Sequence, residues 1–144
     1  MKFKFKSIVL ISVISIVIGL IAYQSLIPKT STHAASQGSS QALIDNAKKD
    51  HLPAWLLFHS QTCASCVEME KIYQTLKPEY EGKIAFVNID VNAPREASLL
   101  EQYKIQYIPT TYLQDGKGKI ISPFVGVIPI EEMRSKLNTL LKSQ

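Results

Sequence analysis

Two cysteines separated by two residues are the side chains of this chain with the clearest chemical potential. Cys63 and Cys66 enclose Ala64 and Ser65, between a short apolar run and a stretch with helical spacing. Residues three apart in a helix share a face, so the two sulfurs can meet and form a disulfide. The N–H groups and the dipole at a helix N-terminus stabilise a thiolate, so we expect Cys63 to have a lowered pKa and to attack disulfides. Cys66 is then the resolving thiol, which closes the bond to Cys63.

Two other roles for this cysteine pair stay open from the sequence. The pair could form an inert disulfide, or it could supply half of an intermolecular metal site. A soft ion such as Cu(I) would suit two thiolates, with His59 as a further ligand. The chain has no second cysteine pair to complete a four-thiolate zinc site. Redox chemistry is therefore the favoured interpretation, with no metal and no cofactor.

Three charged or titratable residues lie close to the cysteines in the sequence. His59 could tune the thiolate of Cys63, but a residue at the end of a strand that is turned to solvent is the favoured interpretation. Glu68 and Glu70 flank the resolving cysteine, and one of them could relay a proton. Because the same helix also buries apolar residues, we expect both glutamates on a solvated face.

The elements that must hold these residues can be predicted from the spacing of apolar side chains. Helical spacing runs from Ala42 to Ala47, Cys63 to Leu76, Pro94 to Tyr103 and Ile130 to Leu141, and strand-like runs cover Ala54–Phe58, Ile84–Ile89, Thr110–Leu113 and Lys119–Val125. The last two strands flank Asp115-Gly116-Lys117-Gly118, a composition typical of a hairpin turn. This order predicts an α/β fold in which a mixed central sheet is flanked by helices on both faces.

Some side chains of these elements have a predicted position. Ser40 is expected to cap the first helix. Trp55 lies in an unbroken apolar run, which is typical of a strand buried on both faces, and is expected in the core. In the helix that follows the cysteines, five side chains are expected to face inward: Val67, Met69, Ile72, Tyr73 and Leu76.

The N-terminal segment differs from the rest of the chain. Three lysines lie within residues 1–6, and 22 uncharged residues, mostly Ile, Val and Leu, separate Lys6 from Lys29. A helix of about 20 apolar residues crosses a bilayer, so we expect residues 7–27 to be a transmembrane signal anchor. The positive-inside rule places residues 1–6 in the cytoplasm and the rest of the chain outside. The alternative is a cleaved signal peptide, with Thr32-His33-Ala34 as the cleavage site and a secreted product.

The segment after the apolar run is small and polar, so we expect residues 28–40 to be a flexible linker and residues 41–144 to be one domain. The chain has 16 Lys and Arg against 12 Asp and Glu, and four of the positive charges lie within residues 1–29. The predicted domain is therefore neutral, which argues against nucleic-acid binding. An apolar content of 46% also excludes a disordered chain.

From residue 42 to 142 the chain resembles the thioredoxin family. The resemblance is carried by residues 58–66, Asn88-Ile89-Asp90, residues 103–110 and Val125-Gly126. It implies a thioredoxin fold in which Pro109 has a cis peptide bond and faces the cysteines. It also implies that Ile108, Pro109 and Thr110 bind an extended client segment, and that Ala64 and Ser65 tune the redox potential.

The chain departs from the family pattern at two positions that matter for proton transfer. The buried acid of the family, six residues before the first cysteine, corresponds to Leu57, and the lysine that accompanies it corresponds to Phe86. Both positions are apolar, so the usual general base is missing and we expect water to carry the proton. The first strand of the family has no clear counterpart, so we expect the sheet to be one strand short.

The resemblance implies a thiol:disulfide oxidoreductase, and the predicted anchor would tether it outside the cytoplasmic membrane of a bacterium. We expect it to reduce disulfides in secreted or membrane-bound client proteins, such as an apocytochrome c before haem attachment, and to be re-reduced by a transmembrane electron carrier. Three alternatives stay open. These are an oxidase or isomerase that donates the disulfide, a copper chaperone, and a non-catalytic binding module that uses the loop from Ile108 to Thr110.

Overall fold

The structure is a computed structural model and describes residues 39–143. The predicted cytoplasmic residues 1–6, the predicted anchor at 7–27 and nearly all of the predicted linker lie outside the described residues. Within residues 39–143, no helix combines the length and the hydrophobicity that a membrane-crossing span requires.

The described elements follow the predicted order of helices and strands. They are α2 (Ser40–Lys49), β1 (Ala54–His59), α3 (Ala64–Leu76), the 3-10 turn η1 (Lys77–Tyr80), β2 (Ala85–Asp90), the 3-10 turn η2 (Pro94–Glu96), α4 (Ala97–Gln102), β3 (Thr110–Gln114), β4 (Ile120–Val125) and α5 (Ile130–Lys142). The strands form one mixed sheet in the order β2-β1-β3-β4. β1 pairs parallel with β2 and antiparallel with β3, and β3 pairs antiparallel with β4. The prediction of a mixed sheet is confirmed.

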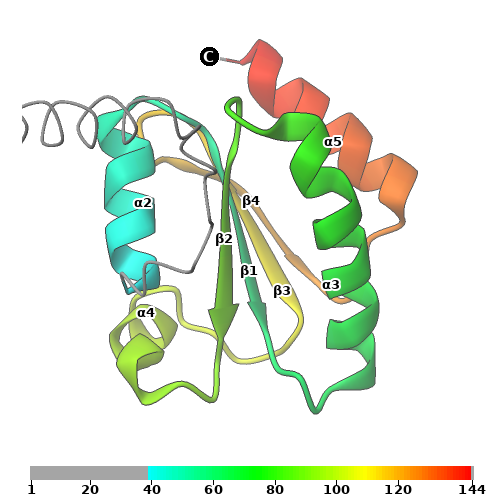
Figure 1. Ribbon diagram of the computed structural model, residues 1–144. Helices are drawn as coiled ribbons and strands as arrows, with labels where there is room; N and C mark the ends of the chain where they lie inside the picture. Colours follow the sequence, from blue (N-terminus) through cyan, green and yellow to red (C-terminus); the bar gives the residue numbers. More distant parts are fainter. Residues whose placement is uncertain (1–38, 144) are drawn as a thin grey trace, which may run out of the picture. The chain divides into compact units, whose positions relative to one another are not determined.

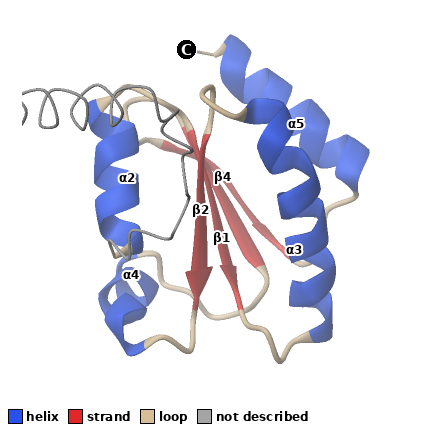
Figure 2. Ribbon diagram, viewed as in Figure 1, coloured by secondary structure: helices blue, strands red, loops and turns tan. Residues whose placement is uncertain are grey.

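Helices cover both faces of this sheet, as Figures 1 and 2 show: α3 and α5 lie on one face, and α2 and α4 lie on the other. β1 lies between β2 and β3, and its six residues are all buried. Alternate side chains of a strand point to opposite faces. Accordingly, Trp55 and Leu57 pack into the core under α3 and α5, and Leu56 and Phe58 pack into the core under α2 and α4. The prediction that Trp55 is a core residue is confirmed.

Aromatic rings fill the core under α3. The ring of Trp55 contacts Tyr73 with a centroid distance of 5.0 Å and Phe86 with a centroid distance of 5.2 Å. Met69 and Leu76 of the same helix are also buried, as predicted. Val67 is not, because 39% of its surface is exposed. The prediction that Val67 faces inward is therefore wrong: the stripe that α3 buries runs through Cys66, Met69, Tyr73 and Leu76.

The start of α2 also differs from the prediction by one residue. Ser39, not Ser40, is the N-cap, and its side chain accepts a hydrogen bond from the backbone N–H of Ala42. Ser40 is the first helical residue and is buried, and its hydroxyl donates to Oε1 of the buried Glu96 at 3.0 Å. This hydrogen bond connects the start of α2 to η2, which contains Glu96.

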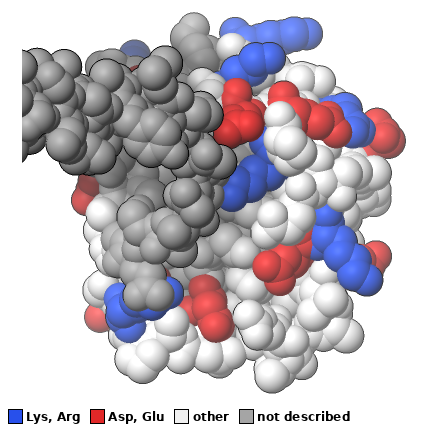
Figure 3. Space-filling model, viewed as in Figure 1, with Lys and Arg blue, Asp and Glu red and all other residues white. Residues whose placement is uncertain are grey.

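The β3-β4 hairpin closes as the turn composition predicts. Oδ1 of Asp115 accepts hydrogen bonds from the backbone N–H groups of Lys117 and Lys119, both at 2.9 Å. Gly118 has φ of +79°, a conformation that favours glycine. On the face of the molecule in Figure 3, acidic and basic side chains are interspersed.

Candidate active site

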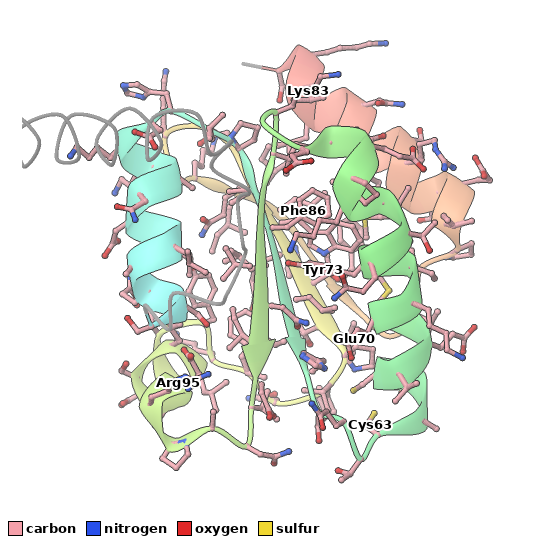
Figure 4. The ribbon with its side chains drawn as sticks, in the orientation of Figure 1. Cys63, Glu70, Tyr73, Lys83, Phe86 and Arg95 are labelled. Carbon is pink, nitrogen blue, oxygen red and sulfur yellow. The ribbon has the colours of Figure 1, made fainter. Side chains whose placement is uncertain are left out.

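The two cysteines lie where the chain leaves the carboxyl end of β1 and enters α3. Cys63 is the N-cap of α3, with extended backbone angles, and Cys66 lies in the first turn. Figure 4 shows Cys63 at the end of α3 that is next to the carboxyl ends of β1 and β2. The predicted start of a helix at the cysteine pair is confirmed.

A buried serine shapes the loop before the cysteines. Oγ of Ser60 accepts hydrogen bonds from Nδ2 of Asn92 at 2.7 Å and from the backbone N–H of Thr62 at 3.3 Å. The backbone carbonyl of Ser60 accepts a hydrogen bond from the N–H of Cys63 at 3.4 Å. These contacts connect the loop after β2 to the segment that presents Cys63. No sequence pattern marks Ser60 or Asn92, because only the fold brings these two residues together.

Cys63 is the more accessible of the two thiols. Its Sγ accepts a hydrogen bond from the backbone N–H of Cys66 at 3.3 Å and lies 3.2 Å from Oγ of Ser65. Hydrogen bonds from Cys66 and then from Ser65 lower the pKa of the Cys63 thiol. The predicted direction of this pKa shift agrees with the structure.

Cys66 has the opposite character. It is fully buried on the inner face of α3 and is a free thiol, as is Cys63. Burial raises the pKa of Cys66 to about 11, and its hydrogen bond to Cys63 acts in the same direction. The site therefore combines an accessible sulfur that ionises readily with a protected sulfur that does not.

The loop before β3 lies at the same edge of the sheet. The Ile108–Pro109 peptide bond is cis, as the family resemblance implies. Thr110 pairs with Phe58 in the sheet register, so Pro109 follows on beside the end of β1, from which the cysteine loop departs. The carbonyl of Pro109 accepts a hydrogen bond from Gly126 at 2.8 Å, and Thr110 donates to the carbonyl of Tyr107 at 2.6 Å. Client binding by Ile108, Pro109 and Thr110 stays a prediction.

The two positions where the chain departs from the family pattern are apolar in the structure as well. Leu57 is fully buried, and Phe86 packs against the rings of Trp55 and Tyr73. Figure 4 shows Tyr73 and Phe86 together between α3 and β2. An acid at the position of Leu57 would therefore meet an aromatic core.

The prediction that His59 is turned to solvent is wrong, and the prediction that Glu70 lies on a solvated face holds only in part. His59 is only 4% exposed. It follows Trp55 and Leu57 in alternation along β1, so its side chain points to the same face of the sheet, under α3. Its Nδ1 lies 3.6 Å from Oε2 of Glu70. The side chain of Glu70 is 30% exposed, and its Oε1 accepts a hydrogen bond from Nδ2 of Asn88 at 3.1 Å. We call these three residues the His59–Glu70–Asn88 cluster.

The prediction for the other glutamate agrees with the structure, since Glu68 is exposed. A signal for Glu70 existed in the sequence: it lies four residues after Cys66, and residues at that spacing share a helix face. Among residues 39–143, no three Cys, His, Asp or Glu side chains gather closely enough to hold a metal ion.

Comparisons with known proteins agree with this geometry. A family model described as a thioredoxin-like domain matches residues 40–141. The thiol:disulfide interchange protein TxlA of Synechococcus elongatus is 21% identical over 141 residues, which cover 98% of this chain and 74% of that protein. Thioredoxin 1 of Chlorobaculum tepidum is 26% identical over 98 residues, which cover 68% of this chain and 94% of that protein.

A solved structure is similar as well. The crystal structure of the germline-specific thioredoxin Deadhead of Drosophila melanogaster matches with a TM-score of 0.59 and 25% identity, over 69% of this chain and 90% of that chain. The match to the family model includes both cysteines and all four strands of the described sheet. The chain therefore belongs to the family of thioredoxin-like domains.

Proposed function

We propose that this protein is a thiol:disulfide oxidoreductase that reduces disulfides of client proteins outside the cytoplasmic membrane. The observation that carries this proposal is the contrast between the two thiols. Cys63 is accessible and has a lowered pKa, whereas Cys66 is buried and has a pKa of about 11. An attacking thiol must ionise near neutral pH, and a resolving thiol must be shielded from other disulfides.

In the proposed reaction, the thiolate of Cys63 attacks one sulfur of a client disulfide. A bond forms between Cys63 and that sulfur, and the other client sulfur leaves as a thiolate. Cys66 then loses its proton and attacks Sγ of Cys63. The mixed disulfide breaks and the second client sulfur leaves as a thiolate. The two thiols of Cys63 and Cys66 have then given two electrons to the client and are left as the Cys63–Cys66 disulfide.

Exposed apolar side chains near Pro109 support the binding of an extended client segment. Tyr107 is 67% exposed and lies two residues before the cis proline. Val125 is also exposed, and it pairs with Thr110 in the sheet register. We propose that the backbone of Ile108 pairs with the client while these side chains contact its apolar residues.

The membrane location of the proposal rests on the sequence. The 22 uncharged residues after Lys6 are long enough to span a bilayer, and the lysines within residues 1–6 favour a cytoplasmic N-terminus. The domain would then face an oxidising compartment, where a reductase needs electrons from a transmembrane carrier. Each reaction cycle ends with the Cys63–Cys66 disulfide, which such a carrier would reduce again.

The reducing direction is supported by how the Cys63 thiolate is stabilised. Hydrogen bonds lower its pKa, and within residues 39–143 no cationic side chain contributes. The disulfide form of a cysteine pair is a strong oxidant when the reduced dithiol form is strongly stabilised. Two hydrogen bonds at a partly exposed sulfur stabilise the thiolate less than a cationic neighbour would.

An insulin-reduction assay tests the proposal. The full-length chain in detergent should accelerate insulin reduction by dithiothreitol. Cys63→Ser should abolish this activity, and Cys66→Ser should trap a mixed disulfide between Cys63 and insulin. The two variants are matched controls, because each removes one sulfur of the same pair. Unchanged turnover in Cys63→Ser would rule out the proposed function.

A further inference from the structure

The resolving step requires a proton acceptor that the family pattern does not supply in this chain. Cys66 is fully buried and its pKa is about 11, so very little of it is ionised at neutral pH. The family's buried acid corresponds to Leu57, which lies in an apolar core. Some other group must take the proton from Cys66, or the step must wait for rare spontaneous ionisation.

The His59–Glu70–Asn88 cluster lies in the layer where that acid would lie. His59 is two residues after Leu57 on β1, and Asn88 pairs with Leu57 in the β1-β2 register. Glu70 reaches the same layer from α3, one helical turn beyond Cys66 on the same face. Figure 4 shows Glu70 on the side of α3 that faces the sheet, near the end that carries Cys63.

The contacts of the cluster hold the carboxylate in place and leave capacity for a proton. Asn88 donates to one oxygen of Glu70, and the other oxygen lies 3.6 Å from Nδ1 of His59. Within the described residues, Nδ1 of His59 and Oδ1 of Asn88 are buried and have no hydrogen-bond partner. Glu70 is partly exposed, so a proton that it accepts can pass on to bulk water.

We propose that Glu70 is the proton acceptor for Cys66 in the resolving step, and that His59 and Asn88 are positioning residues that hold its carboxylate. The proposal rests on the thiol:disulfide exchange proposed above. The proton moves from the Cys66 thiol to Glu70, the new thiolate attacks Sγ of Cys63, and the client sulfur leaves as a thiolate. In this proposal, Glu70 on α3 takes the role that the family pattern gives to an acid at the position of Leu57 on β1.

The other titratable groups around this cluster do not compete for the role. From α3, Tyr73 is buried, and burial raises its pKa, so it stays a neutral phenol. From β2, Asp90 pairs with His59 in the register, and its Oδ1 accepts a hydrogen bond from the backbone N–H of Asn92.

Because Glu70 is negatively charged, the rate of the resolving step can distinguish a proton acceptor from a group that acts only through its charge. The negative charge of Glu70 contributes to the raised pKa of Cys66. If Glu70 acted only through its charge, Glu70→Gln would lower the pKa of Cys66 and would accelerate the resolving step. If Glu70 accepts the proton, the same substitution removes the base and slows that step. The two roles therefore predict opposite changes in rate.

Stopped-flow reaction of the reduced, full-length chain in detergent with excess 5,5′-dithiobis(2-nitrobenzoate) separates the two steps. Attack by Cys63 releases the first nitrobenzoate thiolate at a rate that depends on reagent concentration. Attack by Cys66 on the resulting mixed disulfide releases the second at a rate that does not. The chain has no other cysteine, so both phases can be assigned with Cys63→Ser and Cys66→Ser.

We expect Glu70→Gln to slow the second phase by about tenfold or more at pH 7 and to leave the first phase within about twofold. The matched control is Glu68→Gln, which makes the same charge change on the exposed side of α3 and should leave both phases unchanged. Between pH 6 and 9, the second phase of Glu70→Gln should rise about tenfold per pH unit, because only the Cys66 thiolate reacts. The unsubstituted chain should show a flatter profile.

Positioning is tested with His59→Phe, which keeps an aromatic ring but removes both nitrogens. It should slow the second phase less than Glu70→Gln does and should keep the flatter pH profile. If Glu70→Gln does not fold, as shown by loss of the circular dichroism spectrum of the unsubstituted chain, Glu70→Ala gives the same test on a helix position that tolerates alanine.

Failure of the role of Glu70 and failure of the proposed function would give different results in this experiment. An unchanged or faster second phase in Glu70→Gln, with a normal first phase, overturns the role of Glu70 but leaves the proposed function standing. Loss of a fast, Cys63-dependent first phase in the unsubstituted chain would contradict the proposed function itself.

Discussion

The backbone N–H of Cys66 donates a hydrogen bond to Sγ of Cys63 at 3.3 Å, so the buried residue of the pair stabilises the ionised form of the accessible one. This contact exists because Cys63 is the N-cap of α3, where the first N–H groups have no partner within the helix. The same helix turn then buries Cys66 and raises its pKa. One local structure thus gives the two sulfurs different roles.

The first prediction concerns selective alkylation. Because the pKa of Cys63 is lowered and that of Cys66 is raised to about 11, iodoacetamide at pH 7 should modify Cys63 and leave Cys66 free. Mass spectrometry of peptides after a pH series from 5 to 9 measures both sites. Denaturant should make both residues reactive. Equal labelling of the two cysteines in the folded chain would contradict the assignment of attacking and resolving thiols.

The second prediction concerns the dipeptide between the cysteines. Oγ of Ser65 lies 3.2 Å from Sγ of Cys63, and this contact lowers the pKa of Cys63. Ser65→Ala should therefore raise that pKa, slow alkylation at pH 6 a few-fold, and make the reduction potential more negative, because the reduced form loses a stabilising contact. Ser65→Thr keeps the hydroxyl and is the control. A rate unchanged in Ser65→Ala would show that the contact has no influence on the thiolate.

The third prediction separates the two serines at the start of α2. Ser39→Ala removes the N-cap and should lower the free energy of unfolding by about 1 kcal/mol. Ser40→Ala removes a hydrogen bond to the buried carboxylate of Glu96 and should cost about 1.5–3 kcal/mol. Urea unfolding of a fragment from Gln37 to Gln144 measures both. The opposite ranking would mean that the link between Ser40 and Glu96 contributes little.

The fourth prediction tests whether the family acid can be restored. Leu57→Asp should destabilise the same fragment by at least about 3 kcal/mol at pH 8, because it removes a core side chain and buries a carboxylate without a lysine partner. Burial raises the pKa of such a carboxyl above its unfolded value, so the loss should be smaller at pH 4, where the group is protonated in the folded state and about half protonated in the unfolded state. Leu57→Asn is the control, with the same loss at both pH values. Wild-type stability in Leu57→Asp would contradict the burial of Leu57 in the hydrophobic core.

Much of the fold could be predicted because its signals are local. The apolar run from Ala54 to Phe58 indicates a strand buried on both faces, and the cysteine pair marks the helix that follows. The cis bond at Pro109 followed from the family resemblance, not from spacing, because most X–Pro bonds are trans.

The predictions that were wrong concern residues whose position depends on contacts with residues far away in the sequence. A strand that is buried on both faces shows no alternation of polar and apolar residues, so the burial of His59 under α3 left no pattern in the sequence. Two successive serines can each cap a helix, and the choice between them is made by Glu96, 56 residues away from Ser40. The helix face of Glu70 was predictable, but its contacts with β1 and β2 were not.

The equilibrium reduction potential of the Cys63/Cys66 couple tests the proposed reductase most directly. The full-length chain in detergent is equilibrated across a dithiothreitol series, and the fraction of disulfide is measured by thiol alkylation and mass spectrometry. We predict a potential near about −270 mV, as expected of a dithiol that donates electrons. A potential near about −120 mV would make the protein a disulfide donor and would contradict the reducing direction. Failure to form any disulfide between Cys63 and Cys66 would contradict redox function altogether.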